Sequence, residues 1–166
     1  MISIHIYGKP VAWKRPAHKV VNGRAIVFDS QKEDKEKARW QIRSFYSSDI
    51  LISCPVAIKM NFFFSVPASD SKVRRREKLI GAYNHINKPD VDNLLKFYLD
   101  CLSGYVLVDD CIVYSILGCK HYSESEYVKI DIDPLHNYHE QENSTLLEDL
   151  GLDPNFLDER KDDDFS

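Results

Sequence analysis

The sequence lacks any apolar run long enough to cross a bilayer, which needs about 20 residues. It also lacks the apolar segment of a signal peptide, because its first residues, Met1 to His5, alternate between apolar and polar as in a strand. These absences predict a soluble protein of the cytoplasm with no membrane partner. The length of 166 residues, with no internal repeat, suits one folded domain.

The sequence also lacks a cysteine motif. Its four cysteines, Cys54, Cys101, Cys111 and Cys119, show no C-x-x-C spacing. This absence excludes the usual zinc-binding and thioredoxin-type patterns. We expect reduced cysteines that are mostly buried as small apolar side chains.

The charge is unevenly distributed along the chain. The net charge is −4, but residues 134–166 carry ten acidic and two basic residues, whereas residues 1–133 carry sixteen acidic and twenty basic ones. We therefore predict a basic folded domain, 1–133, and an acidic, partly disordered tail, 134–166. Within the tail, residues 146–152 favour a turn of helix and 158–164 favour disorder. The tail could compete with a polyanionic ligand for the basic surface of the domain, bind another protein or only promote solubility.

Periodicity predicts a mixed α/β (α+β) fold. Alternating apolar residues predict strands over 2–7, 25–28, 55–66, 111–122 and 126–133, the last two forming a hairpin that turns at Ser123–Ser125. Helices are expected over about 31–46, with Ala38, Ile42, Phe45 and Tyr46 buried, and from about 92 to Ser103-Gly104, with a short capped helix within 69–79. The strands near 2, 56, 111 and 126 should form a central sheet on which the helices near 31 and 92 pack.

The most informative stretch runs from Lys88 to Lys96. Asp90 and Asp92 follow a proline at the expected start of a helix, where aspartate is favoured. Asp92, Lys96 and Asp100 then form a stripe with a spacing of four residues. A second acidic pair, Asp109-Asp110, precedes the strand that begins near residue 111.

Acidic side chains placed close together repel one another unless a cation lies between them. Oxygen ligands favour a hard divalent ion such as Mg²⁺ or Mn²⁺, and a nearby lysine can orient a nucleophile or neutralise a phosphate. The alternative is that Asp90 and Asp92 only cap a helix and that Asp109-Asp110 only form a turn. The spacing alone does not separate the two interpretations.

These motifs resemble the RusA family of Holliday junction resolvases, small endonucleases common in bacterial viruses and prophages. The resemblance rests on Lys-Pro-Asp-Val-Asp-Asn-Leu-Leu-Lys, Asp-Cys-Leu-Ser-Gly and Val-Asp-Asp, and more loosely on the opening Gly-Lys-Pro-Val-Ala-Trp-Lys-Arg-Pro and on Val-Pro-Ala-Ser before a basic run. It covers about residues 1–133. It implies a homodimer that cuts four-way junctions by paired symmetrical nicks in DNA recombination and repair.

The resemblance also implies roles for residues of this chain. Asp90, Asp92 and Asp110 would be catalytic and hold Mg²⁺, with Mn²⁺ as an alternative, and Lys96 would be the catalytic lysine. The cation would activate water and polarise the phosphate while Lys96 orients the water or stabilises negative charge. Asn93 and Asp109 would not bind the cation themselves but would orient the residues that do.

Basic residues along the body are candidates for DNA contacts because they neutralise phosphates. Those that we expect to bind DNA are Lys14, Arg15, Lys72, Arg74, Arg75, Arg76, Lys88 and Lys120. Each could instead belong to an ordinary solvated surface. Trp13 could stack on an unpaired base or pack into the core.

Two other functions remain open. The chain could be a nuclease for flaps or replication forks, which an assay of several branched DNAs would distinguish. It could also be a non-catalytic junction-binding protein, which would bind tightly and give no Mg²⁺-dependent product. For each of these functions we expect a protein of the bacterial cytoplasm that associates with the nucleoid when bound to DNA.

Overall fold

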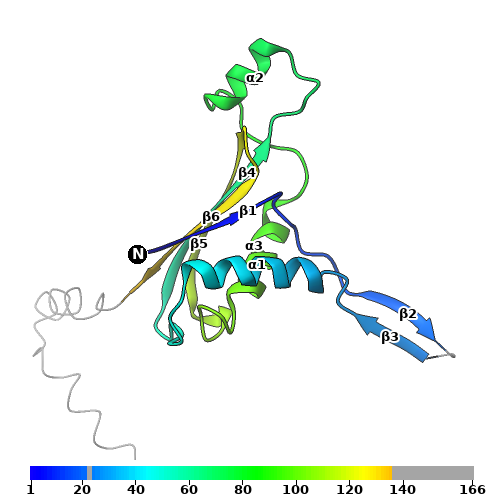
Figure 1. Ribbon diagram of the computed structural model, residues 1–166, viewed down its shortest axis with the longest axis vertical. Coiled ribbons are helices and arrows are strands. Elements are labelled where there is room, and N and C mark those ends of the chain that lie inside the picture. Colours follow the sequence, from blue (N-terminus) through cyan, green and yellow to red (C-terminus); the bar gives the residue numbers. More distant parts are fainter. Residues whose placement is uncertain (22–23, 136–166) are drawn as a thin grey trace, which may run out of the picture. The chain divides into compact units, whose positions relative to one another are not determined.

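The computed structural model describes residues 1–21 and 24–135 (Figure 1). The chain divides into two units, Met1–Pro134 and Leu135–Ser166. The predictions for 146–152 and 158–164 lie outside the described residues. Within the described ranges, no helix has the length and apolarity required to span a bilayer.

The first unit is built on a four-stranded mixed sheet with the strand order β1-β6-β4-β5. Its strands are β1 (Ile2–Tyr7), β4 (Val56–Ser65), β5 (Val113–Ser123) and β6 (Tyr127–Pro134). β4 runs parallel to β5 and antiparallel to β6, and β6 runs antiparallel to β1. A separate two-stranded ribbon pairs β2 (Ala17–Val21) with β3 (Arg24–Phe28). The predicted mixed α+β class and the four strands of the central sheet are confirmed.

The predicted hairpin between the last two strands is wrong, because β4 lies between β5 and β6. Three residues, 124–126, cross the end of β4, a distance of two strand spacings or about 10 Å that they can span. The crossing is fastened by Ser65, whose hydroxyl donates to Glu126 at 3.0 Å, and by the Val66 N–H, which donates to the Ser123 carbonyl at 3.3 Å. A short connection between successive strands therefore did not make them neighbours.

The centre of the core is β4. Its alternate side chains are all buried, namely Val56, Ile58, Met60, Phe62 and Phe64. The side chains between them, such as Lys59 and Asn61, point to the other face of the sheet and are more exposed. This strict alternation is what the sequence predicted for the strand.

Two helices pack with the sheet around this core. Helix α1 (Lys32–Phe45) contacts β1 and α3, and helix α3 (Val91–Leu102) contacts β5 (Figure 1). α3 buries one face, made of Leu94, Phe97, Tyr98, Cys101 and Leu102. The short helix α2 (Lys72–Leu79) begins at Ser71, whose hydroxyl accepts the Arg74 N–H, as expected for a capped helix.

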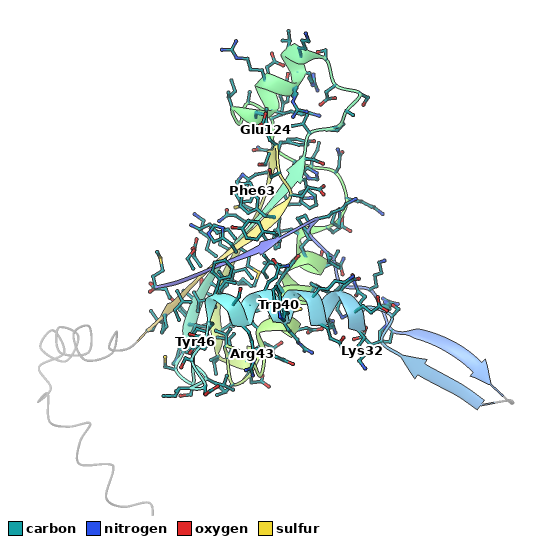
Figure 2. All side chains as sticks on the ribbon, in the orientation of Figure 1. Lys32, Trp40, Arg43, Tyr46, Phe63 and Glu124 are labelled. Atoms are coloured by element: carbon teal, nitrogen blue, oxygen red, sulfur yellow. The ribbon has the colours of Figure 1, made fainter. Side chains whose placement is uncertain are left out.

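Some burial predictions fail. Helix α1 buries Ala38 and Ile42 as expected, but Phe45 near its end is 45% exposed, since the helix contacts its neighbours along one narrow stripe. Trp40 projects from the outer side of the same helix (Figure 2). Among the cysteines only Cys101 is fully buried, whereas Cys111 is exposed beside the acidic turn and the other two are half-buried.

Candidate nuclease site

The start of α3 presents two carboxylates that the helix itself does not use. Asp90 is the residue that precedes the first turn, but its side chain makes no capping hydrogen bond, and only its backbone carbonyl accepts the Leu94 N–H, at 3.2 Å. Asp92 lies in the first turn, where its carboxylate accepts a long hydrogen bond of 3.4 Å from the side chain of Asn93. Both aspartates are exposed. The capping alternative therefore does not account for either carboxylate.

Lys96 lies one helical turn after Asp92 and is covered by Trp13. Its ammonium is 3.8 Å from the centroid of the indole ring, within the range of a cation–π interaction. The Trp13 N–H donates to the Asn93 carbonyl at 2.8 Å, so the backbone of the N-terminal segment is also fixed to α3. Trp13 is half-buried against the core, and its ring holds Lys96 at the same time.

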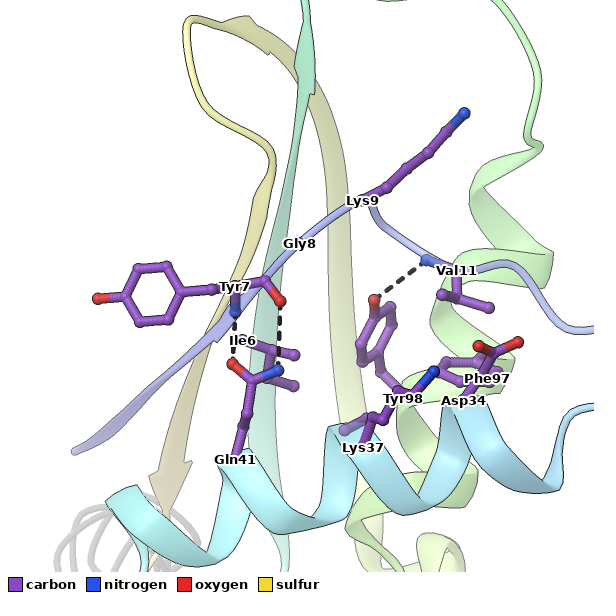
Figure 3. A pocket seen from close by; sticks show the side chains of 11 residues that line it. Ile6, Tyr7, Gly8, Lys9, Val11, Asp34, Lys37, Gln41, Phe97 and Tyr98 are labelled. Atoms are coloured by element: carbon purple, nitrogen blue, oxygen red, sulfur yellow. Dashed lines mark hydrogen bonds between the residues drawn. The ribbon is translucent and has the colours of Figure 1, made fainter.

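Three hydrogen bonds hold the segment before the β2–β3 ribbon in place. Gln31, which is 2% exposed, donates its amide N–H to the Ala12 carbonyl at 2.9 Å and accepts the Lys14 N–H at 2.6 Å. The Val11 N–H donates to the Tyr98 hydroxyl at 3.1 Å (Figure 3). Burial raises the pKa of that hydroxyl, so Tyr98 stays neutral. The exposed Lys14 thus extends from an anchored backbone beside the start of α3.

A cavity of about 200 Å³ lies between β1, α1 and α3, close to this segment (Figure 3). Gln41 closes one side by accepting the Tyr7 N–H at 2.8 Å and donating to the Tyr7 carbonyl at 3.2 Å. These bonds occupy backbone groups of β1, which is an edge strand of the sheet. None of the predicted catalytic residues lines the cavity.

The second acidic pair lies in the short 3₁₀ helix Asp110–Ile112 and the residue before it. Asp109 caps this turn by accepting the Cys111 N–H at 2.9 Å, and this hydrogen bond lowers the pKa of Asp109. The hydrogen bond to Asp109, partial desolvation and the charges of Asp109 and Asp100 raise the pKa of Asp110. The turn-forming alternative therefore describes Asp109, while Asp110 remains exposed.

The structure places the two acidic pairs at different ends of α3. Asp100, whose charge acts on Asp110, lies in the last turns of the helix, eight residues or about 12 Å along the axis from Asp92. Asp100 is itself paired with Lys35 at 3.1 Å. Within residues 1–21 and 24–135, no three acidic, histidine or cysteine side chains are grouped to hold a metal ion. The two free carboxylates at the start of α3 suit a hard cation, but one chain does not supply the third.

The basic residues differ in how freely they can meet DNA. Those that are exposed are Lys14, Arg15, Lys72, Arg76 and Lys88. Arg74 is exposed too, but its guanidinium lies 4.3 Å from the ring centroid of Tyr83, and Arg75 is 3.8 Å from Glu124. Lys120 is turned inward, since its ammonium donates to the Asn87 and Pro89 carbonyls at 2.7 and 3.0 Å.

A family model described as "Endodeoxyribonuclease RusA" matches residues 7–133. The chain belongs to the RusA endodeoxyribonuclease family. It is also similar to a Bacillus subtilis (strain 168) protein named "Uncharacterized protein YqaN", with 30% identity over 134 residues that cover 79% of this chain and 94% of that protein. The class of the protein is therefore that of a DNA endonuclease, as its motifs predicted.

Sequence reasoning missed the residues that hold the site together. Gln31 and Tyr98 act through single hydrogen bonds to backbone groups far away in the sequence, and no pattern marks such bonds. Lys120 was expected to contact DNA, and its partners in the structure are again backbone groups, the carbonyls of Asn87 and Pro89.

Proposed function

We propose that this protein is a divalent-metal-dependent endonuclease that resolves four-way DNA junctions by paired nicks. Membership of the RusA endodeoxyribonuclease family supports the nuclease activity. The single observation that carries the assignment of the site is that Asp90 and Asp92 remain exposed and free of capping bonds at the start of the helix that carries Lys96, one turn after Asp92. A helix that needed these aspartates only for stability would use their oxygens.

Asp90, Asp92 and Asp110 are the proposed metal ligands, and Mg²⁺ is the proposed ion with Mn²⁺ as its substitute. A divalent cation bound there supplies charge neutralisation at the scissile phosphate and activation of water. Lys96 then stabilises the negative charge that develops on the phosphate. The Trp13 ring limits the directions in which the ammonium of Lys96 can point.

We further propose that the protein acts as a homodimer. A four-way junction has two-fold symmetry and needs two nicks, which two symmetry-related sites can make. The same assembly offers a source for the missing ligand, because Asp110 of one protomer could approach the Asp90–Asp92 end of its partner. The exposed position of all three carboxylates is compatible with this arrangement.

The exposed cations are the proposed DNA contacts. Lys14 and Arg15 extend from the segment that Gln31 and Trp13 anchor beside α3, so they would hold phosphates near Lys96. Lys72, Arg76 and Lys88 belong to α2 and to the loop before α3. Charge neutralisation by these residues would provide most of the affinity and make it dependent on salt.

The test is incubation of the purified protein with a synthetic mobile four-way junction, with and without Mg²⁺. Flap and fork substrates are assayed in parallel. Paired symmetrical nicks in the junction support the proposal. Preferential cutting of flaps or forks would reassign the substrate, and tight binding of all branched DNAs without a Mg²⁺-dependent product would identify a non-catalytic binding protein.

A further inference from the structure

One face of β5 contacts the whole segment that leads into α3. Gly118, Lys120 and Tyr122 alternate along the strand, so all three point to the side on which α3 packs. Gly118 contacts the start of α3, Lys120 contacts residues 87–89, and Tyr122 contacts His85. The contacted segment therefore runs antiparallel to β5. Three successive pieces of one segment are therefore held by three successive side-chain positions of one strand.

The contact at Gly118 brings the helix very close to the strand. A Cβ atom at position 118 would lie only 2.9 Å from Val91 and 3.0 Å from Leu95, so glycine permits this approach. The contact at Tyr122 is aromatic. His85, 8% exposed, stacks on Phe64 with ring centroids 4.4 Å apart and lies 4.8 Å from the ring of Tyr122.

Lys120 makes the central contact, and it is polar. Two of the three hydrogens of its ammonium point to the Asn87 and Pro89 carbonyls, at 2.7 and 3.0 Å. Hydrogen bonds from a charged donor are about twice as strong as neutral ones, and here two of them meet at one atom. The second accepting carbonyl belongs to the residue directly before Asp90, so these bonds fix the direction in which the chain enters the helix.

We propose that Lys120 is a positioning residue, which holds the loop 87–89 so that the carboxylates of Asp90 and Asp92 keep their places. This replaces our expectation of a DNA contact at Lys120, because most of its donor capacity is used inside the protein. Methionine has nearly the same length and no donor, so Lys120→Met removes the two hydrogen bonds. We call the two hydrogen bonds from Lys120 to the Asn87 and Pro89 carbonyls the clamp. Its expected effect on cleavage rests on the proposed nuclease function, but the clamp itself does not depend on that function.

The experiment compares the wild type with Lys120→Met, Lys120→Arg and a matched control, Lys59→Met. Lys59 is an exposed lysine of the adjoining strand β4 on the other face of the sheet, so its loss changes the net charge equally. Amide hydrogen exchange is measured over residues 84–95, and junction binding is measured at several salt concentrations. Cleavage is followed under single-turnover conditions, which separate chemistry from binding.

In Lys120→Met, amides between 86 and 92 should exchange about tenfold faster, since two charge-assisted hydrogen bonds are lost. Junction affinity and its salt dependence should remain unchanged, and the cleavage rate constant should fall about tenfold or more. Lys120→Arg should recover part of both losses because its guanidinium can also donate twice. Lys59→Met should match the wild type.

Unchanged exchange in Lys120→Met would overturn the clamp. A weaker affinity with a salt slope reduced by about one phosphate contact would return Lys120 to the DNA surface. If Lys120→Met does not fold, Lys120→Gln, whose NH2 group is uncharged and carried on a shorter side chain, is compared with Lys120→Arg by the same exchange measurement. Equal exchange in these two variants also rejects the positioning role of Lys120. If no protein cuts any branched DNA, the proposed function fails while hydrogen exchange still decides the clamp.

Discussion

The two ends of α3 carry similar acidic signals in the sequence, but the structure treats them differently. At the start of the helix, Asp90 and Asp92 are free of capping bonds, and two other parts of the chain, Trp13 and Lys120 of β5, hold the backbone around them by hydrogen bonds. At the far end, Asp109 is used by its own turn and shares a hydrogen bond with Asp110. At the start of α3, other residues satisfy the local backbone, so the carboxylates of Asp90 and Asp92 are left available for the proposed metal site.

The strongest way to sharpen this comparison is to neutralise one carboxylate in each pair. Asp92→Asn should reduce junction cleavage by about a thousandfold or more, because loss of a metal ligand removes several kcal/mol of transition-state stabilisation. Junction binding should stay equal or become tighter, since repulsion of phosphate falls. Gel-shift and nicking assays on the same preparation measure both.

Asp109→Asn is the matched control for this prediction. Its amide oxygen can still accept the Cys111 N–H, so its effect on cleavage should be small. Normal cleavage by Asp92→Asn would contradict the assignment of the site.

Mixed dimers test whether the two acidic pairs work across protomers. Asp92→Asn and Asp110→Asn should each be inactive alone. A mixed dimer contains one protomer of each variant. If each site combines Asp92 of one protomer with Asp110 of its partner, one of the two sites keeps both aspartates and the other loses both. Single nicks should then return without paired cuts. Continued inactivity of the mixture, with dimer exchange verified by differently tagged protomers, would place all ligands of a site in one chain.

The close packing at Gly118 makes the start of α3 sensitive to a single methyl group. Gly118→Ala should lower the free energy of unfolding by about 1–3 kcal/mol through overpacking against Val91 and Leu95. It should also slow cleavage, because the helix start must move. Urea unfolding and single-turnover cleavage provide the two measurements.

A substitution at the other end of the helix should lower the free energy of unfolding by a similar amount and serves as the control for Gly118→Ala. Gly104 follows α3 with φ +74°, so Gly104→Ala should cost about 1–2 kcal/mol through backbone strain. It should leave the start of α3 in place, so cleavage should fall less than in Gly118→Ala. Equal loss of cleavage in the two variants would show that general destabilisation is responsible.

The indole above Lys96 should have a moderate effect. Trp13→Leu removes a cation–π interaction of about 1 kcal/mol and should slow cleavage roughly fivefold. The affinity of the protein for Mg²⁺ should stay unchanged. Trp40→Leu, on the exposed side of α1, is the control and should cleave normally. Identical rates in both variants would remove Trp13 from the site.

The smallest effect concerns pH. Burial first, and then the charge of Lys120, lower the pKa of His85 from 6.5, so the folded protein binds fewer protons than the unfolded chain below that pH. Stability should therefore fall as the pH drops from 7.5 through 6.5. His85→Phe keeps a ring between Phe64 and Tyr122 and should reduce this dependence in thermal unfolding. An unchanged pH profile would exclude His85 as its source.

Much of this fold could be predicted from local patterns. The alternation of Val56 to Phe64 and the helical spacing of Leu94, Tyr98 and Leu102 placed the central strand and α3 correctly, because burial of one face imposes a fixed period. The pairing of β5 was not predicted correctly, since strand neighbours depend on long-range burial and not on the length of a connection.

The chemistry of the site was divided in the same way. Residue type and spacing identified Asp90, Asp92 and Lys96 as candidates, and membership of the RusA family agrees with a nuclease. Lys120 was expected to contact DNA as a lysine at the end of a strand, with an ordinary solvated lysine as the alternative. Its partners are backbone carbonyls, which every residue possesses and no sequence pattern can single out.

The sequence by itself determined the family, the helical and strand periods and the presence of unusual acidic pairs, because these depend on side-chain chemistry at fixed spacing. Only the tertiary structure decided which carboxylates are free, that the two pairs lie at different ends of α3, and that Lys120 faces inward. The physical reason is that each of these outcomes depends on which distant backbone groups become hydrogen-bond partners when the chain folds.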